Sequence, residues 1–324
     1  MQAVVYRNYG SPDVLQLEEI EKPPVGDNEV LVKIRAASLN PLDWHFMRGR
    51  PAVLRLMFGL RKPRVKRLGI DASGVVEAVG KNVLRFAPGD EVFGACRGAF
   101  AEYACAAESK LAKKSSGVPF EQAASMPIAA ITALQGLRDT GKIQVGQKVL
   151  INGAAGGVGT FAVQIARTFG ADVTGVCSAR NVEMVRSIGA DRVVDYTQED
   201  FTKGSQRYDL IFDCIGNHSL SAYRRALNPR GTYVVVGGPD GRWFSPVDMF
   251  VKAAVLSPFV SQRLAGLSAK HKADDLATLN DLVVSGEVVP VIDRRYALSE
   301  VREAMRYLEE GHARGKVLIM VGGE

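Results

Sequence analysis

The stretch Lys148-Val149-Leu150-Ile151-Asn152-Gly153-Ala154-Ala155-Gly156-Gly157-Val158-Gly159 decides the fold of this chain. Its first part is an apolar run typical of a buried strand, and apolar residues continue at helical spacing from Gly159 to Phe169. A glycine-rich turn between a strand and a helix lets the backbone approach a pyrophosphate, whose charge meets the unpaired N–H groups of the helix. Ala154 occupies the position of the first glycine of Gly-x-Gly-x-x-Gly. We therefore predict a variant dinucleotide-binding loop.

The region after this loop alternates between strand and helix patterns. Further strands are predicted at Ala171–Cys177, Arg192–Asp195, Tyr208–Asp213 and Thr232–Val236, with helices near Asn181–Ile188 and Ser219–Leu227. Such alternation is typical of a parallel sheet with helices on its faces. It is less regular after Pro246 and ends with a predicted strand at Val288–Ile292, a helix at Glu300–Glu310 and a strand at Lys316–Val321.

The first hundred residues follow a different, β-rich pattern. Val30, Val32 and Ile34 alternate with more polar neighbours, as in a half-buried strand. The other predicted strands are Gln2–Tyr6, Leu15–Ile20, Gly74–Val79, Asp90–Ala95 and Phe100–Ala106. Their spacing predicts a barrel-like or sandwiched sheet, and the change of pattern predicts a domain boundary near residue 120.

Length and composition agree with two globular domains. The chain has 324 residues, 47% of them hydrophobic and 23% charged, and no apolar run approaches the roughly 18 residues of a membrane span. Its four cysteines form no Cys-x-x-Cys pair, and no secretory signal pattern opens the sequence, so we expect a reducing cytoplasm.

One segment is strongly basic, because no acidic residue lies between Trp44 and Ile70. The segment contains Arg48, Arg50, Arg55, Arg61, Lys62, Arg64, Lys66 and Arg67. Such a run can attract nucleic acid or an anionic membrane. Because no nucleic-acid-binding module accompanies it, a solvated basic loop is the preferred interpretation, and we expect no nucleic-acid partner.

The choice of cofactor is read about 20 residues beyond the glycine loop, where an acidic residue would bind the ribose 2′-hydroxyl of NAD. Cys177-Ser178-Ala179-Arg180-Asn181 offers a hydroxyl and a guanidinium instead. These groups suit the 2′-phosphate of NADPH. A solvated first-turn arginine is the alternative for Arg180.

The chain resembles the zinc-free quinone oxidoreductase branch of the medium-chain dehydrogenase/reductases over nearly its whole length. Six motifs carry this resemblance. They are Ser38-Leu39-Asn40-Pro41-Leu42-Asp43, Gly69-Ile70-Asp71-Ala72-Ser73-Gly74-Val75-Val76, Pro88-Gly89-Asp90-Glu91-Val92, Asn152 to Gly159, Gly189-Ala190-Asp191 and Arg314-Gly315-Lys316-Val317. The resemblance implies an α/β protein with a GroES-like β-rich catalytic domain and a Rossmann domain with a doubly wound parallel sheet. We place the first part of the catalytic domain at 1–120, the Rossmann domain at 121–260 and the return to the catalytic domain at 261–324.

The resemblance also implies NADPH contacts beyond Ser178 and Arg180. In the loop these are Ala155, Gly156, Gly157 and Val158, and weaker candidates at family-like positions are Thr132, Ile215, Gly237 and Lys316. Tyr196, after the third strand of this region, would help to hold the 2′-phosphate, although a packing role for a half-buried tyrosine is equally compatible with the sequence. A homodimer formed through the edge of the Rossmann sheet is implied as well.

Zinc-dependent relatives hold a catalytic ion with three protein ligands. Asn40 lies in the segment where those relatives begin their ligand set with cysteine, and Ile70-Asp71 replaces their His-Glu pair. No clustered run of four cysteines provides a structural zinc site. We therefore expect no metal, and without a Lewis acid we expect small electron-poor acceptors, quinones or α,β-unsaturated carbonyl compounds, to be favoured.

Three residues are candidates for the chemistry or for substrate contact. Asn40 is either a polar residue of the cleft or the residue that fixes the turn before Pro41. His45 and Tyr103 are possible proton donors, with ordinary packing as the commoner role, and water is the alternative donor. Trp44, Phe46, Met57 and Phe58 form either an apolar wall over the substrate or ordinary core. The alternatives to a reductase are an NADPH-binding accessory protein with little catalysis and a zinc alcohol dehydrogenase.

Overall fold

The computed structural model of the chain describes residues 1–238, 251, 253, 255–256 and 260–322, without the side chains of residues 54 and 57. The chain divides into two compact units. The first unit contains Met1–Ile131, Lys270–Gly286 and Pro290–Glu324, and the second contains Thr132–Ala269 and Glu287–Val289. The chain therefore passes from the first unit to the second at residue 132 and back at residue 270, and residues 287–289 return briefly to the second unit.

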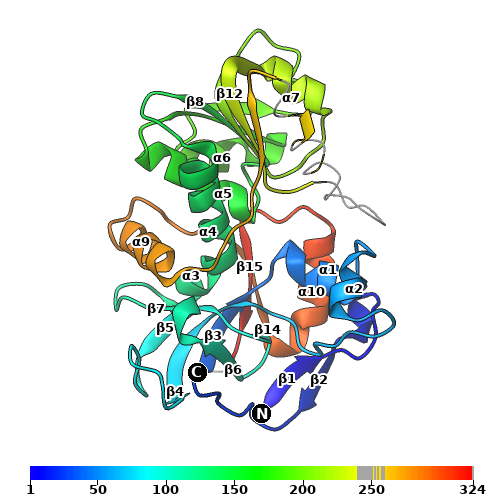
Figure 1. Cartoon of the computed structure of the whole chain (residues 1–324), viewed down its shortest axis with the longest axis vertical. Helices are drawn as coiled ribbons and strands as arrows, with labels where there is room; N and C mark the ends of the chain where they lie inside the picture. The colour runs from blue at the N-terminus through cyan, green and yellow to red at the C-terminus, as the bar shows by residue number, and fades with distance from the viewer. Residues whose placement is uncertain (239–250, 252, 254, 257–259, 323–324) are drawn as a thin grey trace. The chain divides into compact units, whose positions relative to one another are not determined.

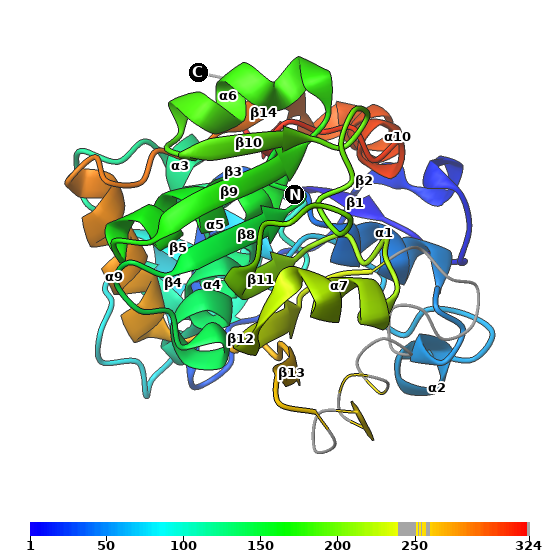
Figure 2. The same cartoon turned by 90° about the horizontal axis from the view of Figure 1, so that it is seen from above.

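The second unit is built on a parallel sheet of six strands in the order β10-β9-β8-β11-β12-β13. In chain order these strands are β8 (Lys148–Asn152), β9 (Asp172–Cys177), β10 (Arg192–Asp195), β11 (Tyr208–Asp213), β12 (Leu227–Val235) and β13 (Arg263–Gly266). Figure 2 shows β10, β9, β8, β11 and β12 side by side. This order, 3-2-1-4-5-6 along the chain, is that of dinucleotide-binding sheets, and the chain reverses direction across the sheet between β8 and β11.

The helices of the second unit follow these strands. They are α5 (Gly157–Thr168), α6 (Val182–Ser187) and α7 (Leu220–Ala226), with a 3-10 turn at Ala179–Asn181 and a π-helical turn at Gly136–Gly141, while α4 (Pro127–Gln135) spans residues of both units. Every residue of α5 from Gly159 to Ala166 is buried, which explains why all of them except Thr160 and Gln164 are apolar or glycine. The predicted helices near 181–188 and 219–227 are thus confirmed as α6 and α7.

The first unit contains a seven-stranded sheet in the order β14-β15-β3-β4-β5-β7, with β6 also paired to β3, and a separate β1-β2 pair. The strands are β1 (Gln2–Val5), β2 (Gln16–Glu19), β3 (Glu29–Ser38), β4 (Asp71–Val79), β5 (Glu91–Ala95), β6 (Tyr103–Ala107), β7 (Leu111–Lys113), β14 (Ile292–Ala297) and β15 (Lys316–Met320). The last strand, β15 (red in Figure 1), pairs antiparallel with β3 through Leu318 and Ser38. The C-terminal segment therefore completes the sheet that the N-terminal segment begins.

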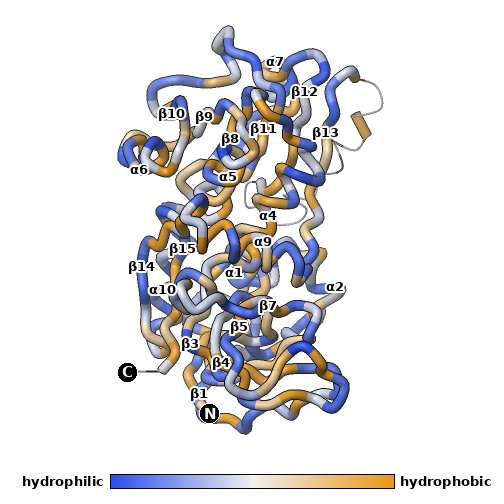
Figure 3. The backbone as a smooth tube through the Cα atoms, turned by 90° about the vertical axis from the view of Figure 1, so that its left-hand side faces the viewer, coloured by the Kyte–Doolittle hydropathy of each residue, from blue (hydrophilic) through white to orange (hydrophobic). Residues whose placement is uncertain are grey.

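Helices close the core of the first unit. They are α1 (Pro41–Arg48), α2 (Leu54–Phe58), α3 (Phe120–Ser125), α9 (Ala273–Val284) and α10 (Val301–Glu309), with 3-10 turns at Pro12–Val14, Glu108–Lys110 and Leu298–Glu300. On α10, Val301, Ala304 and Met305 share one buried face and pack into the core. Apolar stretches alternate with hydrophilic turns along the backbone of both units (Figure 3).

The predicted strand at Val288–Ile292 is wrong, because the strand in this region, β14, begins at Ile292. Pro290 lacks the N–H that a sheet ladder requires. The backbone of Val289 is satisfied by a side chain instead, since its N–H donates to Gln164 Oε1 at 2.7 Å and its carbonyl accepts from Gln164 Nε2 at 3.0 Å. Helix α9 and strand β13 were not predicted.

Candidate functional site

The glycine loop of the second unit connects β8 to α5. Gly153 has φ +85°, a left-handed conformation that favours glycine, and Gly156 is the N-cap of α5. The first intrahelical bond runs from the N–H of Thr160 to the carbonyl of Gly156 at 2.9 Å. The N–H groups of Gly157, Val158 and Gly159 therefore lie in the first turn, where a helix has no internal acceptors for them.

The loop fits a pyrophosphate because its backbone is folded tightly. A Cβ atom at Gly159 would lie 2.0 Å from the carbonyl oxygen of Gly153, so only glycine permits this approach of strand and helix. A Cβ at Gly156 would be 3.5 Å from the same oxygen, an ordinary contact. The positive end of the α5 dipole adds to the attraction for an anion.

Ser178, Arg180 and Tyr196 lie at the carboxyl ends of two neighbouring strands. Ser178 and Arg180 follow β9, and Tyr196 follows β10, whose last residue, Asp195, is the register partner of Cys177. The N–H of Tyr196 donates to the carbonyl of Cys177 at 3.0 Å, which joins the two strand ends. Tyr196 is 57% exposed and Arg180 is exposed, so the edge is open to a ligand.

A polar atom beside Ser178 lacks a partner. Asn181 is buried, and its Nδ2 donates to Ser178 Oγ at 3.2 Å. Its Oδ1 is buried with no hydrogen-bond donor among the described residues. Buried acceptors are rarely left unpaired, so the side chain of Asn181 is incompletely satisfied beside Ser178.

Two further candidates lie along the same edge of the sheet. Ile215 follows β11 and packs on the glycine loop, since a Cβ at Gly153 would lie 2.8 Å from its side chain. Gly237 follows β12, and a Cβ there would lie 2.4 Å from the carbonyl oxygen of Cys214. Thr132 is half-buried on α4. The strand-end candidates thus follow five consecutive strands of the sheet, from β10 to β12.

A buried polar network that the sequence pattern did not predict holds this edge together. Asp213, the last residue of β11, is fully buried, and its Oδ1 accepts from Asn152 Nδ2 at 2.8 Å and from the N–H groups of Ile215 and Gly216. Its Oδ2 accepts from the Tyr233 hydroxyl at 2.6 Å. The signal available in the sequence was a polar residue at the end of two apolar strands, Asn152 and Asp213.

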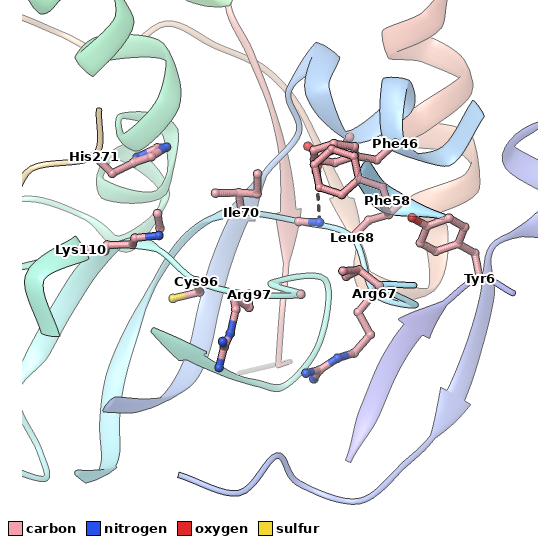
Figure 4. A pocket seen from close by; sticks show the side chains of 15 residues that line it. Tyr6, Phe46, Phe58, Arg67, Leu68, Ile70, Cys96, Arg97, Lys110 and His271 are labelled. Carbon is pink, nitrogen blue, oxygen red and sulfur yellow. Dashed lines mark hydrogen bonds between the residues drawn. The ribbon is translucent and has the colours of Figure 1, made fainter. Parts of the chain in front are cut away.

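The first unit contains a cavity of about 290 Å³. Its apolar wall includes Phe46, Phe58, Val65, Leu68, Ile70 and Ala95, and its polar groups come from Tyr6, Asp43, Arg67, Arg97, Lys110 and His271. Figure 4 shows Ile70 between His271 and Lys110 on one side and Arg67 on the other. Phe46 and Phe58, expected as an apolar wall, do line this cavity, whereas Trp44 does not.

Next to this cavity lies a buried network around Asp71. Asp71 Oδ2 accepts from Asn40 Nδ2 at 2.9 Å, from Ser38 Oγ at 3.1 Å and from Lys316 Nζ at 3.5 Å. Lys316 Nζ also donates to Asn40 Oδ1 at 2.6 Å and to the carbonyl of Leu39 at 3.1 Å. In this structure the Lys316 ammonium, predicted as a cofactor contact, points at oxygens of its own unit.

Asn40 has a clear local role in the structure. It is the N-cap residue of α1, and its N–H donates to Asp43 Oδ2 at 2.8 Å. Its side chain is 2% exposed and bonds to Asp71 and Lys316 rather than facing the cavity. Of the two roles considered for Asn40, this geometry favours the fixing of the turn before Pro41.

Burial dominates the electrostatics of this network. It raises the pKa of Asp71, which the charge of Lys316 opposes, and it lowers the pKa of Lys316, which the charge of Asp71 opposes. Burial also raises the pKa of Asp43 to about 7, against the opposing N–H bond from Asn40. Asp43 Oδ1 accepts from the N–H of Gly69 at 3.1 Å, so both of its oxygens have donors.

The two predicted proton donors lie away from the cavity wall. His45 is on α1, where its ring stacks on Trp44 at 3.9 Å and its Nδ1 is 2.9 Å from the carbonyl oxygen of Arg50. Tyr103 is on β6, and the ammonium of Lys22 lies 3.8 Å from its ring centroid. Neither residue lines the cavity.

The basic segment from Arg48 to Arg67 is only partly solvated. Arg48 pairs with Glu309 at 2.7 Å, and Arg55 donates to the carbonyls of Gly49 and Arg48. Arg67 lines the cavity. The remaining basic residues of the segment, Arg50, Arg61, Lys62, Arg64 and Lys66, are exposed, as a solvated loop requires.

The described residues contain neither a cluster of metal ligands nor a helix able to span a membrane. No group of three or more His, Cys, Asp or Glu side chains in this part of the chain is placed to hold a metal ion. Within the same residues, no helix combines the length and the apolar character needed to cross a bilayer.

The chain is similar to known dehydrogenases and oxidoreductases. Residues 26–116 match the model of the alcohol dehydrogenase GroES-like domain, and residues 188–319 match that of the zinc-binding dehydrogenases. The chain is 32% identical to a chloroplast envelope quinone oxidoreductase homolog of Arabidopsis thaliana, over 98% of both chains. It is 34% identical to the chloroplastic NADPH-dependent alkenal/one oxidoreductase of the same plant, over 98% of this chain and 79% of the relative.

Among solved structures, a quinone oxidoreductase from Coxiella burnetii is similar with a TM-score of 0.88 and 31% identity, over 99% of both chains.

Proposed function

The chain belongs to the medium-chain dehydrogenase/reductase superfamily, and from that premise we propose that it is a zinc-independent, NADPH-dependent oxidoreductase that reduces quinones or α,β-unsaturated carbonyl compounds. The second unit would hold the cofactor along the carboxyl edge of its sheet. The first unit would supply the cavity for the electron-poor acceptor.

The observation that carries the cofactor assignment is the grouping of Ser178, Arg180 and Tyr196 at the joined ends of β9 and β10. A 2′-phosphate there would meet two hydroxyls and one guanidinium, all of them groups that donate to phosphate oxygens. Asp195 Oδ1, at the end of β10, accepts from the N–H and the hydroxyl of Thr197. The guanidinium of Arg180 is the group that favours an anion over a ribose hydroxyl at this edge.

The chemistry follows from what the first unit offers. Bound NADPH supplies a hydride, and a conjugated acceptor spreads the charge it gains over its own oxygen. The apolar wall of Phe46, Phe58 and Ile70 can orient a flat ring and exclude water. The proton that completes the reduction comes from water in this proposal, because neither of the two candidate side-chain donors, His45 and Tyr103, lines the cavity.

The test is to compare Arg180→Ala with the wild type for both cofactors. Loss of a charge-assisted hydrogen bond of about 1.5–3 kcal/mol should raise the KM for NADPH about tenfold or more and leave that for NADH nearly unchanged. Arg186→Ala, an exposed arginine in the last turn of α6, removes the same charge away from the strand ends and serves as the control. Equal losses with both cofactors would remove the basis for the assignment.

The acceptor panel should contain ortho- and para-quinones, enones and simple aldehydes, assayed on protein stripped of metal. Turnover of the conjugated acceptors alone supports the proposal. Activity that appears only with added zinc and simple alcohols or aldehydes would favour a zinc alcohol dehydrogenase. Tight NADPH binding with no turnover of any acceptor would favour an accessory protein.

We also propose a reducing compartment and a homodimeric assembly for this protein. The four cysteines, Cys96, Cys105, Cys177 and Cys214, are all free, which supports a reducing compartment such as the cytoplasm. Strand β13 has β12 as its one sheet neighbour among the described residues, and we propose that a second copy pairs at this end of the sheet. Sedimentation of the purified protein would test the expected homodimer.

A further inference from the structure

The segment between Trp44 and Ile70, which is basic and has no acidic residue, also exposes apolar side chains. Leu56 is 65% exposed, Leu60 is 70% exposed and Val65 is 56% exposed. Apolar residues exposed singly are ordinary, but here three of them lie in one short stretch. Exposed cations lie between and beside them, at Arg61, Lys62, Arg64 and Lys66. Solvation accounts for these cations but not for the apolar side chains.

A closed loop holds Leu60 at an exposed tip. The N–H of Arg64 donates to the carbonyl of Phe58 at 2.8 Å and closes the loop. The turn within it is tight, since a Cβ at Gly59 would lie 2.1 Å from the carbonyl oxygen of Lys62. The exposed residues that share this tip are Leu60, Arg61 and Lys62.

The inner side of the same loop is anchored to the first unit. The Tyr9 hydroxyl donates to the carbonyl of Gly59 at 2.8 Å, and the guanidinium carbon of Arg55 lies 4.7 Å from the Tyr9 ring centroid. The Phe58 ring packs on Phe46 with 4.7 Å between the centroids. Figure 1 and Figure 2 both show α2 at the periphery of the first unit. The loop is therefore fixed on its inner side and open to a partner on its outer side.

The charge and the apolar exposure together identify the kind of partner. Nucleic acid would pair with the cations but would leave the leucines in water, because its outer surface is a phosphate backbone. A second copy of the chain in a two-fold contact would bring the same cations together, which like charges oppose. An anionic bilayer satisfies both features, because its headgroups attract lysine and arginine and its acyl boundary accepts leucine.

We propose that the loop of residues 56–66 docks the protein on anionic phospholipid bilayers. Leu56 and Leu60 enter the boundary between headgroups and acyl chains, while the cations of the loop bind the headgroups. This inference goes beyond the proposed function and does not depend on it. Phe58 and Val65 belong to the loop and also line the cavity of the first unit, so docking would hold that cavity close to the bilayer.

The test is co-sedimentation of the full chain with vesicles of phosphatidylcholine containing about one quarter phosphatidylglycerol, compared with vesicles of phosphatidylcholine alone. Partitioning onto the anionic vesicles should be stronger by about tenfold or more and should fall as salt is added. Lys62→Glu combined with Arg64→Glu should lower it by more than about tenfold. Arg186→Glu combined with Arg225→Glu changes the net charge equally at exposed residues of α6 and α7, and this control should retain most of the binding.

Leu60→Ser tests the apolar contribution. It should lower partitioning onto the anionic vesicles by about fivefold or more, because the leucine leaves water when the loop docks. Leu84→Ser, at a residue that is 91% exposed outside the loop, is the matched control and should change the partitioning little. Leu56→Ser is a second test within the loop.

No binding to the anionic vesicles at low salt would overturn the proposal. Equal losses in the loop and control charge variants would also overturn it, because net charge alone would then explain the binding. So would binding that both leucine variants retain, and tighter binding of duplex DNA at the same salt would then identify nucleic acid as the partner. Dimerisation that depends on Leu60 in sedimentation velocity would identify a second copy instead. Turnover of a water-soluble quinone with NADPH, measured without vesicles, tests the proposed function separately.

Discussion

The candidate binding sites of the two units are built in different ways. The candidate cofactor edge of the second unit is local in sequence, since Gly153 to Gly159 and Ser178 to Arg180 lie within one strand–helix–strand repeat. The cavity and buried network of the first unit join residues as distant as Tyr6, Asp71 and Lys316. The cofactor edge of the second unit depends on backbone shape. The cavity and network of the first unit depend on charges that folding has buried away from water. We therefore expect the stability of the second unit to be sensitive to added side-chain volume and that of the first unit to be sensitive to changes of charge.

The largest expected effect is the loss of one partner from the buried network. Lys316→Met leaves the Asp71 carboxylate, which is fully buried, without its cation and should lower the free energy of unfolding by about 3–5 kcal/mol. Urea unfolding followed by circular dichroism measures this. The control is Lys81→Met, which breaks the exposed 2.9 Å pair with Asp27 and should change the stability little. If the two variants were equally stable, the network would not hold the first unit together.

A pH dependence of stability is expected from Asp43. In the unfolded chain this carboxyl ionises near its ordinary pKa of 3.8, while in the folded chain burial raises the pKa to about 7. The unfolded state therefore releases the proton first, and the folded state loses stability as the pH rises from about 4 to about 7, by at most about 4 kcal/mol. Above about pH 7 the loss is complete.

Comparison with Asp43→Asn isolates this titration from others in the network. The difference in unfolding free energy between wild type and variant should slope between pH 4 and 7 and be level above. The variant should also lose about 1–3 kcal/mol at low pH, because an amide can accept only one of the two N–H bonds from Asn40 and Gly69. A difference that does not vary with pH would show that Asp43 does not titrate in this range.

The smallest of these effects tests the sterics of the glycine loop. Gly159→Ala adds a Cβ that would lie 2.0 Å from the carbonyl oxygen of Gly153 and should lower the unfolding free energy by about 1–3 kcal/mol. Gly156→Ala adds the same atom at 3.5 Å from that oxygen and should stay within about 0.5 kcal/mol of the wild type. Unfolding of the cofactor-free protein is the measurement. Equal stabilities of the two variants would contradict the steric basis of the loop.

The sequence pattern was a guide to the strands of both units, since the predicted Gln2–Tyr6, Leu15–Ile20 and Asp90–Ala95 correspond to β1, β2 and β5 of the first. The strand and helix around the glycine loop, and the strands ending at Cys177, Asp195 and Asp213, lie where the pattern predicts them. β8 and α5 stand out in the sequence as nearly continuous apolar runs, because almost all of their residues are buried. The pattern failed at Val288–Ile292, where the Gln164 amide replaces a neighbouring strand, a contact that no local periodicity can reveal.

The sequence by itself determined the fold class, the dinucleotide loop and the absence of an acid after Cys177, because each depends on residues close together along the chain. Only the tertiary structure decided that Lys316 and Asn40 bond to Asp71, that His45 and Tyr103 lie off the cavity wall, and that Arg67 Nη1 has no hydrogen-bond partner within the described part of the chain. Burial and long-range pairing set the cost of a charge, and both arise only when segments hundreds of residues apart pack together.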